Sequence, residues 1–396
     1  MLSQPPIAMT VEYPHLRLTR WPFPIVPDRS FSTFIAGRPA LQADIEQLLT
    51  ALSRRDTSSI HVVWSWLGAG KTHSLLYLAN EANRRNSSLG VRLLPVYTEF
   101  PKGTTTFLQL FSKVFDDLSA EAIVEAYLEV GTSPQGERPL REYLAPHPDL
   151  AVALRVLAVG EPRDQLTAWR WLRCEELPIA SFRAIGIGQR ISTSEQATRI
   201  LAAIIGLLHL AARTAGSRGT RLLWIIDELQ RLRRCGSRAI ADVNAGLHSL
   251  FNASPVGLSL ILSFSGTPDP ARLPDWFSPE LRDRIGTTKV MLLPPLSAGD
   301  ALDLIREVLA QFRPEAVPDD RGFFPFTKEA CRFILAEAAK HGPLRPRTIM
   351  HAFNAVLEET EQRIEQGEVS VIDPDACAQA LKDHAFLSAD EREDDE

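Results

Sequence analysis

Residues 65–72, with the sequence SWLGAGKT, constrain this chain more than any other stretch. An apolar run at 60–64 precedes them, and a run compatible with a helix follows at 73–82. This order predicts a strand, a turn rich in glycine and a helix that begins at the turn. Glycines in such a turn let backbone N–H groups face phosphates at the positive end of the helix. The stretch is therefore predicted to be a phosphate-binding loop.

Each position of the loop has an expected role. Lys71 supplies a point charge for the β- and γ-phosphates of ATP, and Thr72 supplies a hydroxyl ligand for Mg²⁺. Ser65 stands where the usual motif begins with glycine, but that position only begins the turn. The residues expected to bind the nucleotide here are Ser65, Gly68, Ala69, Gly70, Lys71 and Thr72. The alternative is a glycine turn that precedes Lys-Thr by chance.

Composition indicates a soluble globular protein with no general attraction to nucleic acid. Of the 396 residues, 45% are hydrophobic and 23% are charged, which are ordinary values for that class. The length favours two or three packed units. The net charge is -6, so any contact with DNA must come from a local patch or from a partner protein.

The sequence predicts no zinc site, no disulfide framework and no membrane segment. The four cysteines are scattered without Cys-x-x-Cys spacing, which fits a reducing cytoplasm. The N-terminus lacks the basic start and the apolar core of a signal peptide. The longest apolar run, residues 200–212, is too short to span a bilayer and contains His209.

Five apolar segments predict the strands of a parallel sheet. They are residues 60–64, 91–98, 221–226, 257–264 and 289–293. Helical patterns lie between them, so the expected fold is a three-layer α/β P-loop NTPase core, in which ligands bind beyond the carboxyl ends of the strands. Pro95 suits an edge strand better than a central one, because proline cannot donate to a sheet ladder.

The pattern also predicts the domain organisation. The expected parts are a proline-rich arm laid over a domain at 1–30, an α/β core at 31–296, a helical lid at 297–386 and a disordered acidic tail at 387–396. A long helical insert covers about residues 101–215 of the core. Trp169, Trp171 and Leu172 of this insert are expected to be core residues rather than a platform for nucleobases.

The third predicted strand ends in two carboxylates, Asp227 and Glu228. ATP hydrolysis requires bound phosphates, neutralised charge and a water molecule aimed at the γ-phosphorus. Asp227 is expected to hold Mg²⁺ beside Thr72, and Glu228 is expected to orient or deprotonate the water. The alternative is that the acidic pair is only the N-cap of a helix.

A hydroxyl group at the end of the fourth strand is a further candidate. Ser265 lies where its side chain would position the attacking water, and Ser263 and Thr267 are rivals for that role. Serine at this place is also ordinary turn chemistry, which is the alternative.

Three arginines are candidates for sensing the γ-phosphate. Arg284, in the sequence LRDRI, would neutralise phosphate charge from a neighbouring subunit as an arginine finger. The alternative for Arg284 is a surface ion pair with Asp283. Arg345 and Arg347 precede a lid helix and would report the nucleotide to the lid, with Arg347 as the first choice.

An arginine cluster follows the acidic pair and consists of Arg231, Arg233, Arg234 and Arg238. Such a cluster can bind the phosphates of a nucleic acid, so DNA is a possible partner. A solvated helix face or a contact between subunits is an equal alternative, because no aromatic residue interleaves with the arginines.

A resemblance to a known family rests on several of these motifs together. They are residues 34–38 (FIAGR), the phosphate loop, the Asp227-Glu228 pair and the segments that contain Arg284 and Arg347. With them, residues 31–386 resemble AAA+ ATPases, in the branch that holds replication initiators and the transposition regulators TnsC and TniB. The resemblance implies an ATPase core with a helical lid, adenine held near Ile35 and Gly37, and an active site shared between subunits of a ring or filament.

Two features depart from that branch. Replication initiators usually carry a winged-helix DNA-binding domain after the lid, whereas this sequence stops soon after Phe386, so direct binding to a specific origin sequence is not expected. The chain also has the long insert, with AWRWLR at 168–173 and FRAIGI at 182–187. This arrangement resembles the ATP-binding proteins of BREX-type phage-defence systems.

Two functions from different classes follow. The first is a Mg²⁺-dependent ATP hydrolase that oligomerises and couples its nucleotide state to partner proteins acting on DNA, in phage defence or a mobile element. The second is a signalling switch of the STAND type, which holds its nucleotide closed and assembles once on a trigger. The sequence lacks an array of sensor repeats, which disfavours the switch. A nucleotide-bound scaffold without turnover is a third possibility, and Glu228 disfavours it.

Overall fold

The computed structural model describes residues 12–24, 31–85, 90–103, 105–133, 137–269, 272–285, 290–313 and 322–382. The chain divides into two compact units, and each is described by itself. Unit 1 comprises Met1–Ala43, Leu67–Ser74 and Leu293–Glu396, and unit 2 comprises Asp44–Trp66 and Leu75–Leu292. The predicted acidic tail and much of the predicted N-terminal arm lie outside the described residues. The predicted domain boundaries stay predictions.

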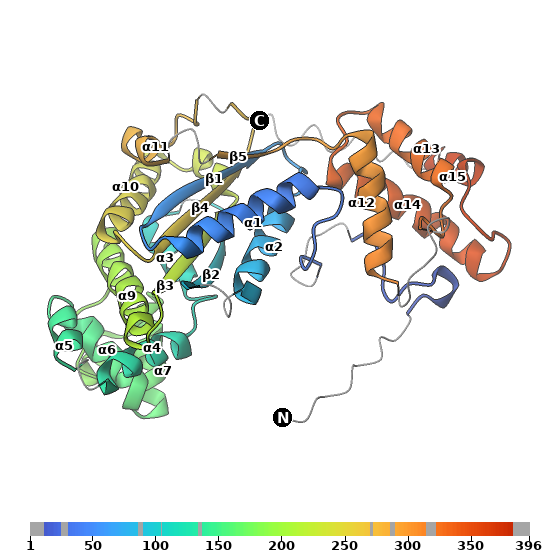
Figure 1. Cartoon of the computed structure of the whole chain (residues 1–396). Coiled ribbons are helices and arrows are strands. Elements are labelled where there is room, and N and C mark those ends of the chain that lie inside the picture. Colours follow the sequence, from blue (N-terminus) through green and yellow to red (C-terminus); the bar gives the residue numbers. More distant parts are fainter. Residues whose placement is uncertain are drawn as a thin grey trace. The chain divides into compact units, whose positions relative to one another are not determined.

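A five-stranded sheet in the order β2-β3-β4-β1-β5 is the centre of the α/β part (Figure 1). The strands are β1 (Ser59–Ser65), β2 (Arg92–Glu99), β3 (Thr220–Asp227), β4 (Leu258–Ser265) and β5 (Val290–Leu293). β2 pairs with β3, β3 with β4, and β4 with β1, and all three pairings are parallel. The carboxyl ends of β1, β2, β3 and β4 therefore lie at the same edge, with Ser65 opposite Ser265 and Glu99 opposite Asp227.

The edge position of β2 confirms the prediction made from Pro95. In the described sheet β2 has β3 as its neighbour and ends the strand order. Pro95 lacks an N–H group, and the next outward N–H, that of Tyr97, donates to the Asp117 side chain at 2.9 Å. A proline and a side-chain acceptor thus complete the outer edge of β2 without another strand.

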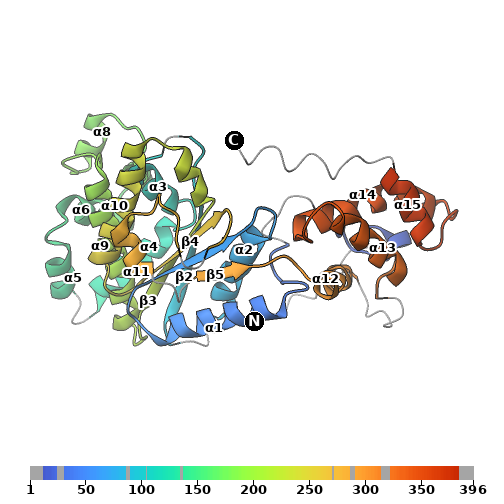
Figure 2. The ribbon, with the colours of Figure 1, turned by 90° about the horizontal axis from the view of Figure 1, so that it is seen from above.

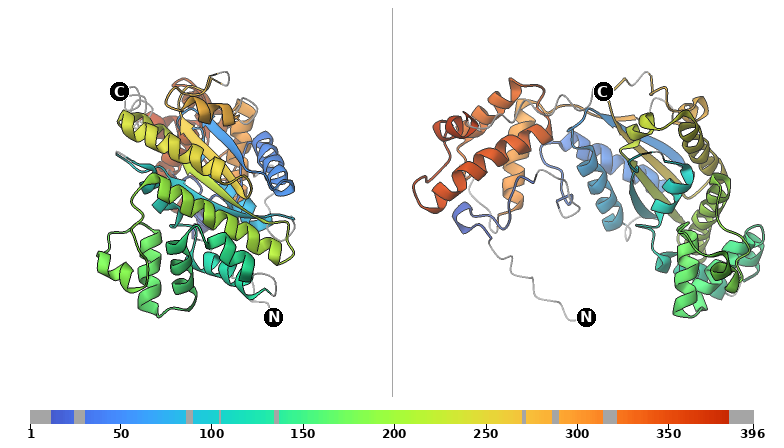
Figure 3. Two further views of the ribbon diagram at one scale, coloured as in Figure 1. Left: turned by 90° about the vertical axis from the view of Figure 1, so that its left-hand side faces the viewer. Right: turned by 180° about the vertical axis from the view of Figure 1, so that it is seen from behind.

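Helices cover both faces of the sheet, which makes the fold a three-layer α/β P-loop NTPase fold. α1 (Pro39–Arg54) and α2 (Lys71–Arg84) lie on one face, and α3 (Phe107–Val114), α9 (Ser194–Thr214) and α10 (Ser237–Ala253) lie on the other (Figure 3). β3 is buried along its whole length, as a central strand between two helical layers must be. α11 (Pro279–Ile285) lies between β4 and β5 in the chain.

The long insert between β2 and β3 is helical, as predicted (Figure 2). Besides α3 and α9 it contains α4 (Ala120–Thr132), α5 (Glu137–Leu144), α6 (Pro148–Val159), α7 (Pro162–Leu172) and α8 (Ile179–Ala184). Trp171 and Leu172 are buried, and Trp169 is half-buried with its ring 5.5 Å from that of Phe115. These side chains are core residues, which confirms the prediction.

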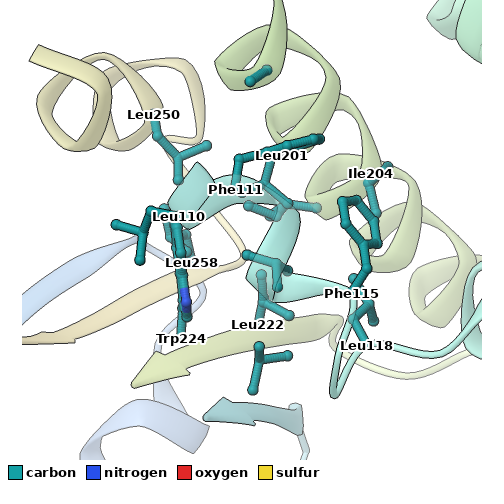
Figure 4. Close-up of a cluster of buried hydrophobic side chains, with 14 of the residues drawn as sticks. Leu110, Phe111, Phe115, Leu118, Leu201, Ile204, Leu222, Trp224, Leu250 and Leu258 are labelled. Carbon is teal, nitrogen blue, oxygen red and sulfur yellow. The ribbon is translucent and has the colours of Figure 1, made fainter. Parts of the chain in front are cut away.

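The core of unit 2 is built where α3 meets the sheet. Figure 4 shows Leu110 and Phe111 of α3 among side chains from β3, α9 and α10, including Leu222, Trp224 and Leu201. These five residues are buried, and each buried side chain of this size contributes roughly 1.5–3 kcal/mol to folding. The packing fixes the insert against β3, the strand that ends in the acidic pair.

Among the described residues, α9 is long and apolar enough to cross a membrane by length and composition. It has 21 residues, so the sequence argument that the run at 200–212 is too short does not hold for the whole helix. α9 packs on β3, α4 and α10, and its apolar side is part of the unit 2 core. Burial in that core accounts for its apolar composition.

Unit 1 contains the helical lid. Its helices are α12 (Ala298–Gln311), α13 (Lys328–Ala339), α14 (Pro346–Glu365) and α15 (Pro374–Lys382). Residues 12–24, with the short helix η1 (Pro14–Leu16), pack on the lid. Phe23 is buried against the rings of Phe326 and Phe353, and the Trp21 indole N–H donates to Asn354 Oδ1 at 2.6 Å.

A buried arginine joins β3 to its surroundings at the amino edge of the sheet. Arg221 is 1% exposed, and its guanidinium donates to Ser259 Oγ at 2.7 Å, to Thr57 O at 3.0 Å and to Arg55 O. Burial lowers the pKa of Arg221 to about 10, and Asp56 opposes that shift. The hydrogen bonds of this side chain link β3 to β4 and to the segment between α1 and β1.

We expect Arg221→Met to destabilise the protein by at least about 2 kcal/mol, since a buried acceptor left without its donor costs about 1–3 kcal/mol. Arg92→Met is the matched control: Arg92 lies on the neighbouring strand and is exposed, so its loss should change stability by no more than about 0.5 kcal/mol. Urea unfolding of both variants measures the difference. Equal stabilities of the two variants would contradict the role of Arg221 as a link between these segments.

Candidate functional site

The phosphate loop in unit 1 has the backbone that its glycines predict. Gly68 has φ +73° and Gly70 has φ +87°, a region that residues with a Cβ rarely adopt. α2 begins at Lys71, so its first backbone N–H groups open onto the loop. Lys71 is only 5% exposed, which strengthens the effect of its charge on an anion bound there. The loop and helix together form the kind of site that binds phosphate.

The start of lid helix α14 lies against this loop. The Arg347 N–H donates to Gly68 O at 3.2 Å, and a Cβ added at Gly68 would lie 3.2 Å from Arg347 Cβ and 3.8 Å from Arg345 Cδ. A Cβ added at Gly70 would lie 3.5 Å from the Pro346 ring. The structure therefore brings both predicted sensing arginines, Arg345 and Arg347, to the phosphate loop, and the two glycines permit that close approach.

The segment that contains Ile35 and Gly37 is fixed from two sides. Gly37 has φ +63°, its N–H donates to Glu307 Oε2 at 2.9 Å, and a Cβ there would lie 2.4 Å from Asp300 O. Gly37 thus has a structural reason to be glycine, because α12 passes directly over it. Ile35 is half-buried. Adenine binding by these two residues stays a prediction.

His73 joins this segment to the helix of the phosphate loop. Its Nε2–H donates to the Phe34 carbonyl oxygen at 2.8 Å. Burial lowers the pKa of His73, while the bond to Phe34 opposes that shift. The imidazole therefore favours its neutral form with the proton on Nε2, and its hydrogen bond holds the FIAGR segment against the start of α2.

The acidic pair lies in unit 2 at the carboxyl end of β3. Asp227 is fully buried and receives three hydrogen bonds: from Ser263 Oγ at 2.8 Å and the Glu228 N–H at 2.8 Å, both to Oδ1, and from Tyr97 Oη at 3.0 Å to Oδ2. Ser263 comes from β4 and Tyr97 from β2, the two strands that flank β3. Hydrogen bonds to the charged form stabilise a buried carboxylate. The arrangement fixes where Asp227 presents its oxygens.

Tyr97 remains a hydrogen-bond donor over the whole useful pH range. Burial raises the pKa of its hydroxyl far above the usual value, and the negative charge of Asp227 raises it further. Tyr97 therefore stays protonated beside Asp227.

Glu228 adopts a conformation that is uncommon for a residue with a side chain. Its φ is +60° and its ψ is 27°, and its Oε2 accepts from Gln230 Nε2 at 3.1 Å and pairs with Arg231 Nη2 at 3.3 Å. Glu228 precedes the 3-10 helix η3 (Leu229–Arg234), but its side chain makes no capping hydrogen bond to that helix. Glu228 therefore stands at the N-cap position of η3 without capping it through its side chain, and its left-handed backbone is of a kind that clusters at functional sites.

The three hydroxyl candidates near β4 lie in different environments. Ser263 is buried and contacts Asp227, whereas Ser265 ends the strand and its N–H donates to Gln230 Oε1 at 2.9 Å. Thr267 is exposed. Gln230 thus connects the end of β4 with Glu228, because its amide oxygen accepts from Ser265 and its amide nitrogen donates to Glu228. Opposite Ser265, the Ser65 hydroxyl donates to Trp66 O at 3.0 Å, so Ser65 ends β1 and uses its side chain locally.

The predicted arginines do not share one environment. Arg231 turns inward: it pairs with Glu228 and with Glu99 at 2.7 Å and donates to Phe100 O at 2.6 Å. The other members of the predicted cluster, Arg233, Arg234 and Arg238, are exposed. Arg284 is exposed in the last turn of α11, and the salt bridges among the described residues do not include the alternative pair with Asp283.

Sequence reasoning missed Tyr97, Gln230 and Glu99. Tyr97 lies in a segment already predicted to be a strand, but only the order of the strands places it beside Asp227. Gln230 and Glu99 act through contacts with Glu228 and Arg231, which no local pattern announces.

The residues available for a cation are oxygen donors. Thr72 offers a hydroxyl and Asp227 a carboxylate, and Mg²⁺ prefers such ligands, with its remaining positions taken by waters and substrate phosphates. Among the described residues there is no group of three or more His, Cys, Asp or Glu side chains that would hold a metal without a substrate. Each of the two donors, taken by itself, is therefore of a type that suits Mg²⁺.

Comparisons with known proteins give similar structures only. No protein-family model and no curated protein matches this chain. The ORC1 protein of Aeropyrum pernix in complex with DNA is 15% identical, over 92% of this chain and 69% of that one, with a TM-score of 0.49. The ORC2 protein of the same organism, in ADPNP-ADP complexes, is 15% identical over 91% and 72%, with a TM-score of 0.49. Domain III of the replication initiation protein DnaA of Thermotoga maritima is 13% identical over 91% and 98%, with a TM-score of 0.42. At these values the similarity carries no argument about what this chain does.

We expect Tyr97→Phe to weaken Mg²⁺ binding, measured with a non-hydrolysable ATP analogue, by about tenfold or more, as losses of residues that support metal ligands do. Tyr143→Phe is the matched control, because Tyr143 is also partly buried and its hydroxyl donates to Ala203 O at 2.9 Å in the insert. Each variant should lose about 1 kcal/mol of stability with its hydrogen bond. If both variants keep the same Mg²⁺ affinity, Tyr97 does not position Asp227 for a metal.

Proposed function

We propose that this chain is a Mg²⁺-dependent ATPase of the AAA+ type that works as a homo-oligomer in the cytoplasm. The observation that supports this most is Asp227, a buried carboxylate held by three donors at the end of a central strand and followed at once by Glu228. β1 ends at the same edge of the sheet, and the phosphate loop is the next segment of the chain. A phosphate loop that follows one strand in the chain and an acidic pair at the end of another strand are parts that ATP hydrolysis requires.

Each residue has a part in the proposed reaction. Lys71 and the N–H groups at the start of α2 hold the phosphates, and Thr72 and Asp227 are the ligands for Mg²⁺, which neutralises charge on the phosphates when it is bound. Glu228 orients the attacking water and accepts its proton. Ser263 and Tyr97 hold the Asp227 carboxylate in place through hydrogen bonds, and Ser265 stays a candidate for contact with the water.

The lid is proposed to respond to the nucleotide. Arg345 and Arg347 lie at the phosphate loop within unit 1, so a γ-phosphate in the loop would attract both guanidinium groups. Because the two arginines open α14, their movement would be passed to the helices that pack on it. The nucleotide state would thereby change the surface that the lid offers to a partner.

The proposed setting is action on DNA with partner proteins, in phage defence or a mobile element. It is supported by the resemblance of the phosphate loop, the acidic pair and the insert to ATPases of such systems. Genes that neighbour this one test the setting directly. A neighbourhood without defence or transposition genes would count against it.

Two substitutions separate binding from chemistry. Lys71→Ala should remove most of the affinity for ATP, because the phosphates lose a dedicated cation. Glu228→Gln should bind Mg²⁺-ATP as before but turn over at least about a hundredfold more slowly, since loss of a general base costs that much. Calorimetry and phosphate release measure the two effects.

Glu99→Gln is the matched control for Glu228→Gln. Glu99 is also an ion-pair partner of Arg231, so its loss disturbs the same arginine without removing the proposed base. This control should keep turnover within a few-fold of the original protein. Unchanged ATP affinity in Lys71→Ala, or full turnover in Glu228→Gln, would contradict the assignment.

We propose that Arg284 completes the site of a neighbouring subunit. Its exposed position in α11 suits a contact with another chain. Arg284→Ala should keep ATP binding but lose about a thousandfold or more in turnover, which is what an arginine finger is worth. Mixing it with Lys71→Ala should restore part of the activity, because each variant supplies what the other lacks. Mixed oligomers that stay inactive would show that Arg284 does not act in trans.

A further inference from the structure

Two chain segments next to the acidic pair contain basic residues and no acidic ones. Residues 229–241 contain four arginines and no acidic residue, and residues 100–106 contain Lys102 and no acidic residue. Because Arg231 turns inward, the exposed charges are Lys102, Arg233, Arg234 and Arg238, which we name the basic surface. The chain as a whole has a net charge of -6, so this surface differs in sign from the average of the molecule.

Contacts join the two segments of the basic surface. The Arg231 guanidinium donates to Phe100 O at 2.6 Å, and the Cys235 thiol donates to Gly103 O at 3.3 Å. Lys102 lies between these two anchored positions of its loop. The loop after β2 is therefore held onto η3, and Lys102 is placed beside the segment that carries the exposed arginines.

The two acidic residues that line the pocket next to the basic surface each pair with a basic side chain. A pocket of about 470 Å³ adjoins it, and its lining includes Lys102, Arg231, Glu99 and Asp116. Glu99 pairs with Arg231 at 2.7 Å, and Asp116 pairs with Lys113 and with Arg173, each at 3.0 Å. By contrast, no ion pair of Lys102, Arg233, Arg234 or Arg238 occurs within the described ranges. Within residues 100–103 and 229–241, the exposed charged side chains are therefore all positive.

The chemistry of the surface favours a nucleic acid over a protein partner. Protein interfaces have an apolar centre, but the exposed large hydrophobic residues of the described chain lie outside residues 100–103 and 229–241. Phe100 is fully buried, so the surface offers no aromatic ring on which a base would stack. Exposed arginines instead match phosphate groups, which they bind in a bidentate manner.

We propose that the basic surface binds the phosphate backbone of double-stranded DNA directly and without regard to sequence. This proposal deepens the proposed function, and it rests on that function for the choice of DNA as the polymer. Base edges are not read, because sequence readout needs side chains that reach into a groove in addition to phosphate contacts. Arg231 is not one of the DNA contacts, since it is held by Glu228 and Glu99.

The proposal places the DNA contacts on η3 and on the first turn of α10, immediately after Glu228 in the chain. A DNA backbone bound to Arg233 and Arg234 would contact η3, the short helix that also carries Arg231. Two of the four residues of the basic surface, Arg233 and Arg234, thus lie on the helix of six residues that follows Glu228 directly.

The test measures binding of a fluorescent duplex of mixed sequence by anisotropy over a series of salt concentrations. The variant Arg233→Gln, Arg234→Gln, Arg238→Gln should lose at least about tenfold in affinity, and its salt slope should fall by about 2.7, since each phosphate contact contributes about 0.9. Lys102→Gln should lower the slope by about 0.9. A duplex of different sequence should bind equally well.

The matched control replaces three exposed arginines of the insert, Arg155, Arg163 and Arg183, with glutamine. This control changes the net charge equally and should keep both the affinity and the slope. Equal losses in the two triple variants, or no salt-dependent binding with and without an ATP analogue, would overturn the proposal. A basic-surface variant that keeps DNA binding but no longer binds an acidic protein partner would also overturn the proposal.

The outcome is separable from that of the proposed ATPase activity. Phosphate release without DNA should be the same in the basic-surface variant and in the original protein, because none of these residues is placed in the catalytic machinery. One outcome is that the original protein binds DNA and loses that binding in the basic-surface variant, yet shows no ATPase activity. That result would uphold the basic surface and contradict the proposed function. Intact ATPase activity in a protein that ignores DNA would do the reverse.

Discussion

The structure depends on one buried negative charge, the carboxylate of Asp227. A carboxylate without water is very unfavourable unless hydrogen bonds replace its hydration. Here Tyr97 from β2, Ser263 from β4 and the backbone of Glu228 supply those bonds. Two of these donors, Tyr97 and Ser263, require β3 to lie between β2 and β4 in parallel register, so the charge and the strand order support each other.

β3 carries a buried charged group at each end. Arg221 holds the amino end through three acceptors, and Asp227 holds the carboxyl end through three donors. Between them the strand is apolar and packs against α3 and α9. The long insert therefore does more than extend the chain, since its helices α3 and α9 cover the strand that presents the acidic pair. Rigid elements of this kind position a site more accurately than loops do.

Patterns that are local in sequence predicted the fold, while contacts between distant segments did not follow from them. Apolar runs and glycines give the strands, the phosphate loop and the α/β class, and Pro95 gives the edge position of β2. Ser263 was a rival to Ser265, and only the pairing of β3 with β4 distinguishes its contact with Asp227. Arg231 belongs to an arginine cluster in sequence but turns inward in the structure, because two carboxylates and a carbonyl lie there.

The central claim is that the phosphate loop and the acidic pair make this chain an enzyme with sustained turnover. Steady-state phosphate release by the unmodified protein, with a parallel assay of the nucleotide it carries, tests that claim most directly. The account predicts that each chain releases many phosphates at saturating Mg²⁺-ATP and that release stops when Mg²⁺ is removed. Release of no more than one phosphate per chain, with ADP held tightly afterwards, would contradict it and would favour a switch that acts once.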